Sequence, residues 1–198
     1  MASAAVPISS HPSSIPTIET TETAKPARWG PRWSPEAVAS SIEQYTKETG
    51  WVEGTVWQWS QTQTTEDDIV FHTALDVMAA TLHRTKTILI HSEPFNAQHS
   101  SAITAEIKNV ERTMGLLLHQ FTLIRPLETP LQAFNVGVGM EEHYNLFVKF
   151  ENAAKAKLSE PGLSEAVQAF DSLDKMFIET VTLFKGAAPG EPVERPAA

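Results

Sequence analysis

Seven apolar residues recur at alternating intervals of four and three positions along residues 103–124, and this ladder constrains the fold more than any other feature. Its members are Ile103, Ile107, Val110, Met114, Leu117, Phe121 and Ile124. Most of the residues between them are polar. Such spacing, about 3.5 residues on average, is typical of a helix that keeps one apolar face against neighbouring helices. The ladder therefore predicts a long helix lying along other helices.

Similar apolar spacing and helix-boundary residues predict four further helices. The five expected helices cover residues 34–48, 65–91, 98–125, 129–158 and 163–185. Ser34 followed by Pro35 is a strong start signal, and Gly50 is expected to end the first helix. Short connections make consecutive helices antiparallel neighbours. We therefore expect an all-α fold, an up-down-up-down four-helix bundle with an additional N-terminal helix.

Two segments fit this pattern poorly. Residues 51–64 mix tryptophans with polar residues, and we expect an irregular segment folded over the bundle. Across residues 134–140 the apolar residues alternate with a period of two. Gly137 and Gly139 lie in this stretch, and each lowers helix propensity by about 1 kcal/mol relative to alanine. The fourth helix is therefore expected either to begin near Met140 or to kink at the glycines, which indicate close helix packing or a hinge.

The composition of the 198-residue chain predicts one folded domain over residues 34–186. The tails on either side, residues 1–33 and 187–198, are expected to be disordered. Cysteine is absent, which excludes thiol catalysis, disulfides and cysteine-bound metal clusters. The formal charge of −9 argues against binding to nucleic acid. No apolar run reaches the length of a transmembrane helix, and no secretory signal peptide is evident. We therefore expect a cytoplasmic protein.

Basic and tryptophan residues gather just before the first expected helix, in residues 25–33. Tryptophan beside arginine suits stacking and cation–π contacts with a partner. The candidate partner-binding residues are Arg28, Trp29, Arg32 and Trp33. The alternative is that both tryptophans fold back onto the protein's own bundle.

The main hypothesis is a non-enzymatic helical bundle that acts in assembly or partner binding, without a cofactor. Large apolar residues outside the ladder, including Leu116, Leu118 and Leu123, favour self-association into a homo-oligomer or binding to another protein. No Gly-x-Ser-x-Gly motif indicates a hydrolase. A further hypothesis places an apolar ligand inside the bundle beside residues 137–139.

The alternative hypothesis is a helical bundle that binds a divalent metal or a small ligand, with or without catalytic activity. Three candidate ligands recur every four residues along the second expected helix, and two more lie on the fourth. They are Asp68, His72, Asp76, Glu142 and His143. The Glu-x-x-His pattern of di-iron bundles is absent from the sequence.

Overall fold

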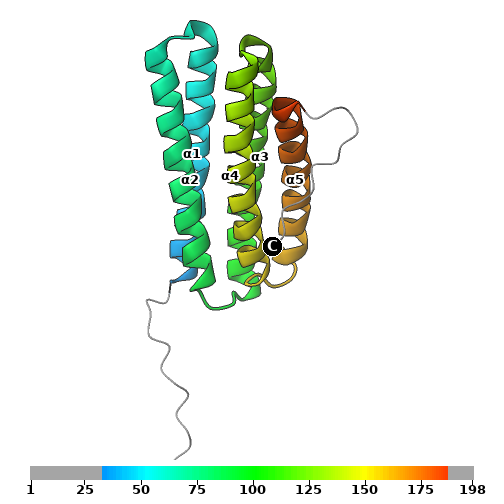
Figure 1. Cartoon of the computed structure of the whole chain (residues 1–198). Helices are drawn as coiled ribbons and strands as arrows, with labels where there is room; N and C mark the ends of the chain where they lie inside the picture. The colour runs from blue at the N-terminus through cyan, green and yellow to red at the C-terminus, as the bar shows by residue number, and fades with distance from the viewer. Residues whose placement is uncertain (1–32, 187–198) are drawn as a thin grey trace, which may run out of the picture. The chain divides into compact units, whose positions relative to one another are not determined.

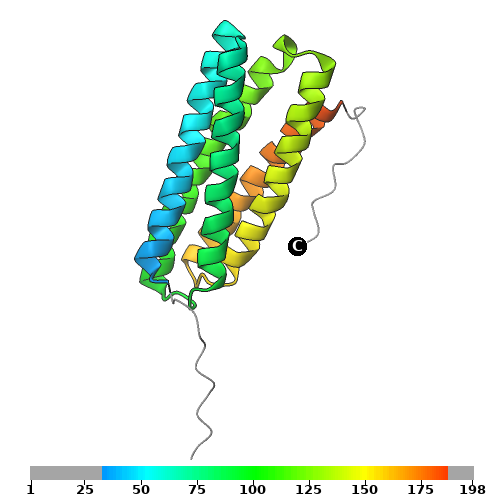
Figure 2. The same ribbon diagram turned by 60° about the vertical axis from the view of Figure 1, so that its left-hand side comes forward.

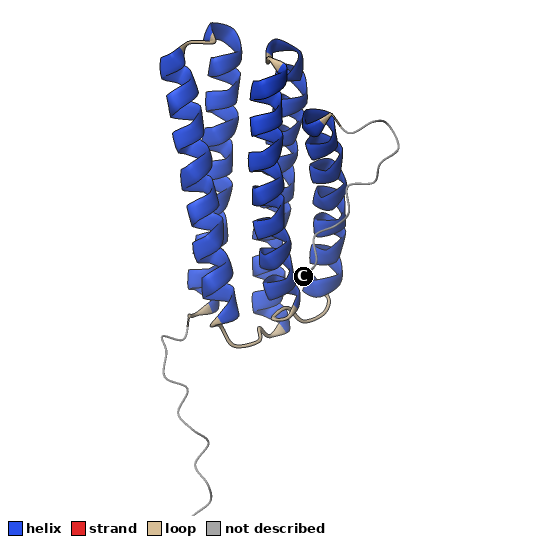
Figure 3. Cartoon of the chain, in the orientation of Figure 1, coloured by secondary structure: helices blue, strands red, loops and turns tan. Residues whose placement is uncertain are grey.

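The computed structural model describes residues 33–186, and every regular element in this range is helical (Figures 1 and 3). The elements are α1 (Pro35–Thr62), α2 (Thr65–Ile90), α3 (Ala97–Ile124), the short 3-10 helix η1 (Arg125–Leu127), α4 (Pro130–Lys155) and α5 (Gly162–Lys185). The prediction of an all-helical chain with five helices is confirmed. Within the described range, no helix is both long and apolar enough to cross a membrane.

The five helices form two layers around a shared apolar core (Figures 1 and 2). Helices α1, α3 and α5 lie side by side in one layer, and α2 and α4 form the other. Contacts of α1 with α2 and of α4 with α5 join the layers at both edges. The chain reverses direction from each helix to the next. All seven members of the α3 ladder are buried in this core.

Helix α1 is much longer than the sequence predicts. The expected end at Gly50 and the expected irregular segment over residues 51–64 are wrong, because α1 continues without interruption to Thr62. Its buried stripe keeps the intervals of four and three throughout: Val38, Ile42, Tyr45, Thr49, Val52, Val56 and Trp59. Burial of these side chains outweighs the cost of about 1 kcal/mol for a glycine inside a helix.

Helix α4 begins at Pro130 and remains helical through both glycines, so of the two expected alternatives the late start near Met140 is wrong. Thr129 explains the early start. Its hydroxyl accepts a hydrogen bond from the Gln132 backbone N–H, and the Gln132 side chain accepts one from the Thr129 N–H (3.0 Å). This reciprocal cap satisfies backbone donors that would otherwise lack partners.

The two glycines of α4 have different surroundings. A Cβ atom on Gly137 would lie 3.0 Å from the Cβ of Phe184, so the predicted close helix packing is confirmed there, against α5. A Cβ atom on Gly139 would have no neighbour within 4 Å. Gly137 therefore lets α4 approach α5, whereas Gly139 faces open space.

We expect replacement of Ile107 by alanine to lower the free energy of unfolding by about 2–5 kcal/mol, because this fully buried ladder residue would leave a cavity. Urea denaturation measures the change. The matched control is Leu116→Ala in the same helix, at a side chain that is 52% exposed, and its effect should stay within about 0.5 kcal/mol. Equal losses for the two variants would contradict the assignment of the ladder to the core.

Candidate functional site

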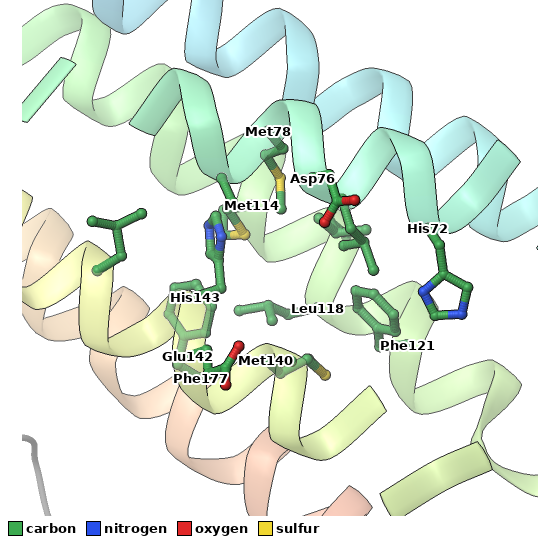
Figure 4. A pocket seen from close by; sticks show the side chains of 15 residues that line it. His72, Asp76, Met78, Met114, Leu118, Phe121, Met140, Glu142, His143 and Phe177 are labelled. Carbon is green, nitrogen blue, oxygen red and sulfur yellow. The ribbon is translucent and has the colours of Figure 1, made fainter. Parts of the chain in front are cut away.

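A cavity of about 330 Å³ lies inside the bundle between α2, α3, α4 and α5 (Figure 4). Its apolar lining residues are Leu75, Met78, Ala79, Met114, Leu117, Leu118, Phe121, Met140, Leu146 and Phe177. The remaining lining residues are His72, Asp76, Gly139, Glu142 and His143. Volumes of roughly 300–1,000 Å³ and mostly apolar walls with a few polar groups are typical of small-molecule sites. The cavity is therefore the candidate binding site.

Seven of the fifteen lining residues of this space are methionine or leucine. The ladder of α3 supplies Met114, Leu117 and Phe121, so one stripe both holds the core together and forms a wall. Methionine adapts its shape readily, and Met78 and Met140 line the cavity from the opposite layer. Gly139, which faces open space, is an exposed lining residue of the same cavity.

The cavity opens to solvent between α2 and α4. Its exposed lining residues are His72 and Asp76 on α2, and Gly139 and Glu142 on α4. Figure 4 shows His72 and Phe121 toward one end of the cavity, and His143 and Phe177 toward the other. The rim is therefore polar and acidic, while the interior is apolar.

A buried hydrogen bond between two helices marks the inner end of the cavity. The Tyr45 hydroxyl on α1 and the His143 Nε2 on α4 are 2.8 Å apart. Burial lowers the pKa of His143 to about 4 and raises the pKa of Tyr45, so both side chains are uncharged at neutral pH. This end of the cavity is polar but provides no positive charge.

Beyond this pair, aromatic rings fill the core. The ring centroids of Phe147 and Phe150 are 5.7 Å apart, and Phe170 lies 5.9–6.0 Å from both. Phe177 lies 5.4 Å from Phe147 and continues this cluster to the cavity wall. An aromatic cluster thus packs against the cavity wall at Phe177.

The predicted metal ligands are near one another but do not form a metal centre. Four of them, all but Asp68, line the cavity. Asp68 Oδ1 is 3.8 Å from His72 Nε2. The Nε2 atom of His143 is already engaged in a hydrogen bond with the Tyr45 hydroxyl. Across residues 33–186, no group of three His, Asp or Glu side chains could hold a metal ion. Their positions instead make them polar groups at the rim and the inner end of the cavity.

The predicted partner-binding segment is almost entirely outside the part of the chain that the structure describes. Arg28, Trp29 and Arg32 lie in the undescribed residues, as do most of residues 1–33 and all of residues 187–198. Trp33 is described; it precedes α1 and is 36% exposed. Partner binding by this segment and self-association both stay predictions.

Comparison with known proteins finds a fold relative but no sequence family. No protein-family model and no curated protein matches the chain. The crystal structure of AfMP4p in complex with palmitic acid has a similar fold, with a TM-score of 0.70 and 8% sequence identity. The superposition covers 76% of this chain and 99% of that one. At this identity the likeness establishes the shared fold alone.

These findings correct the main hypothesis from the sequence, a non-enzymatic scaffold for assembly or partner binding. The bundle encloses a cavity of ligand size, and a protein of the same fold has been crystallised with palmitic acid. Both observations favour the alternative hypothesis in its small-ligand form. The chain is an all-helical protein that shares its fold with AfMP4p.

We expect His143 to make the protein less stable at mildly acidic pH. Its pKa in the folded state, about 4, lies below the ordinary value of 6.5, so the unfolded chain binds a proton more readily between these values. The contribution of His143 to the free energy of unfolding should therefore fall by about 2 kcal/mol as the pH decreases from 7 to 5, whatever other groups contribute.

The test compares urea denaturation of the wild type and His143→Gln at both pH values. Glutamine keeps a polar group for Tyr45 but does not titrate. The variant should lose about 2 kcal/mol less than the wild type over this range. The same loss in both proteins would show that His143 is not held uncharged in the core.

Proposed function

We propose that this protein binds one long-chain lipid in the cavity between α2, α3, α4 and α5. The observation that carries the proposal is an apolar cavity of about 330 Å³ whose polar groups lie at its rim and its inner end. An alkyl chain in this space would be removed from water, at about 25 cal/mol per Å² of apolar surface. The palmitic acid in the crystal structure of AfMP4p supports a ligand of this class.

We further propose that α2 to α5 act as the up-down-up-down four-helix unit expected from the sequence. All the lining residues of the cavity belong to these four helices. Helix α1 packs on α2 and α3 and contributes Tyr45, which holds His143 at the inner end. In this proposal α1 closes the core and orients one wall residue.

The proposed role is carriage or sequestration of the lipid. The described lining residues include no serine, threonine, cysteine or lysine, and the carboxylates Asp76 and Glu142 lie at the exposed rim. The one buried histidine of the cavity is hydrogen-bonded to Tyr45.

We expect Gly139→Leu to weaken binding at least about tenfold, because the new side chain would enter the cavity, where a Cβ atom meets no neighbour within 4 Å. Binding is measured by the fluorescence of the uncharged probe N-phenyl-1-naphthylamine. The substitution should also raise helix propensity, so the variant should remain folded.

The matched control is Gly54→Leu on α1. A Cβ atom there also has no neighbour within 4 Å, but Gly54 does not line the cavity. Its affinity for the probe should equal that of the wild type. Equal affinities in all three proteins, or no probe binding by the wild type, would overturn the proposed function.

A further inference from the structure

A second, smaller cavity adjoins the proposed lipid site. It has a volume of about 170 Å³ and is lined by Trp59, Asp68, Phe71, His72, Glu128, Gln132, Asn135 and Val136. His72 lines both cavities. The rings of Phe71 and Phe121, one from each cavity, are 5.9 Å apart. The two spaces are therefore immediate neighbours, and the second is the more polar.

The polar cavity leads toward the turn between α1 and α2. A third hollow, of about 160 Å³, shares Trp59, Asp68 and Gln132 with it. This outer hollow is also lined by Gln63, Thr64 and Thr65 at the turn itself. Polar side chains thus line two neighbouring hollows between this turn and the apolar cavity.

Negative charge dominates the polar cavity. Its ionisable lining residues are Asp68 and His72 from α2 and Glu128, which follows η1; the residues from α1 and α4 are uncharged. Glu128 Oε2 is buried and accepts no hydrogen bond from any residue between 33 and 186. Burial raises the pKa of Glu128 to about 7; nearby Arg125 opposes the rise and Asp68 adds to it. Glu128 is therefore an acceptor without a donor.

Positive charge is scarce where a lipid head group would lie. The nearby Arg125 donates a hydrogen bond from Nε to the Leu183 carbonyl (3.4 Å), and its guanidinium lies 5.8 Å from the Phe184 ring centroid. The rim of the lipid cavity carries Asp76 and Glu142. The carboxylate of a fatty acid in either cavity would therefore be repelled by aspartate and glutamate side chains. Neither lining contains a lysine or arginine that could pair with it.

We propose that the polar cavity is the head-group site, and that it selects lipids whose head group donates hydrogen bonds and carries no negative charge. A hydroxyl, amide or ammonium head could donate to Glu128 Oε2 while the alkyl chain occupies the apolar cavity. The inference rests on the proposed function, and it names the class of lipid. It predicts that a free fatty acid binds this chain more weakly than the corresponding alcohol.

The test measures displacement of N-phenyl-1-naphthylamine by 1-dodecanol and by dodecanoate, which have chains of equal length. At pH 8 the alcohol should displace the probe at a concentration about tenfold lower than dodecanoate. At pH 6 the difference between the two displacing concentrations should be smaller. Glu128, whose pKa is about 7, gains a proton as the pH falls from 8 to 6 and then no longer repels the dodecanoate carboxylate.

Two variants locate the effect. Glu128→Gln should strengthen dodecanoate binding at pH 8 by about tenfold and flatten its dependence on pH. Asp68→Asn, on a partly exposed side chain, provides a second test if the first variant folds poorly, and should act in the same direction. Glu179→Gln, exposed on α5 and outside both cavities, is the matched control and should change nothing.

The outcomes separate the two proposals. Probe binding followed by equal displacement by alcohol and carboxylate at pH 8 would overturn the head-group site and leave the lipid cavity standing. A preference for the alcohol that persists unchanged in both Glu128→Gln and Asp68→Asn would also overturn it. Failure of the wild type to bind the probe would overturn the lipid cavity and, with it, the head-group site.

Discussion

Burial of the apolar ladder of α3 is the interaction on which the other parts of this bundle depend. Helix α3 lies in the middle of the layer of three helices, between α1 and α5, so its buried residues meet side chains from both layers. Each of its seven buried ladder residues contributes roughly 1.5–3 kcal/mol of transfer free energy before chain entropy is subtracted. Because Met114, Leu117 and Phe121 also line the cavity, stability and the proposed binding rest on the same helix face.

The hollow half of the core follows from which side chains meet there. On one side of the Tyr45–His143 hydrogen bond, phenylalanine rings from α4 and α5 fill the space. Around the cavity the lining residues include three methionines, four leucines and Gly139 as well as Phe121 and Phe177, and the space that they leave opens between α2 and α4. The pair itself is uncharged at neutral pH, because burial disfavours a positive charge on His143. Packing thus limits the cavity, and polar residues lie at its rim and its inner end.

Helices could be predicted from the sequence where short-range signals agreed with the apolar spacing, as in α3. The predicted helix end at Gly50 is wrong, because the helix propensity that a glycine costs is smaller than the free energy gained by burying the apolar stripe that extends to Trp59. Of the evenly spaced residues Asp68, His72 and Asp76, the last two line the cavity, since residues four apart share a helix face. Their predicted role as metal ligands stays a prediction. The role of His143 depended on Tyr45, which is 98 positions away. The cavity volume could not be predicted, because it depends on side chains from four helices.

The most direct test of the lipid site is an NMR experiment on protein with ¹³C-labelled methionine methyl groups and bound 1-dodecanol. Met78, Met114 and Met140 line the cavity, whereas Met176 packs beside Gly115 outside its lining. The account predicts nuclear Overhauser effects between the alkyl chain and the first three methyl groups, and none to Met176. Contacts to Met176 alone, or to no methionine with the ligand bound, would contradict a lipid site between α2, α3, α4 and α5.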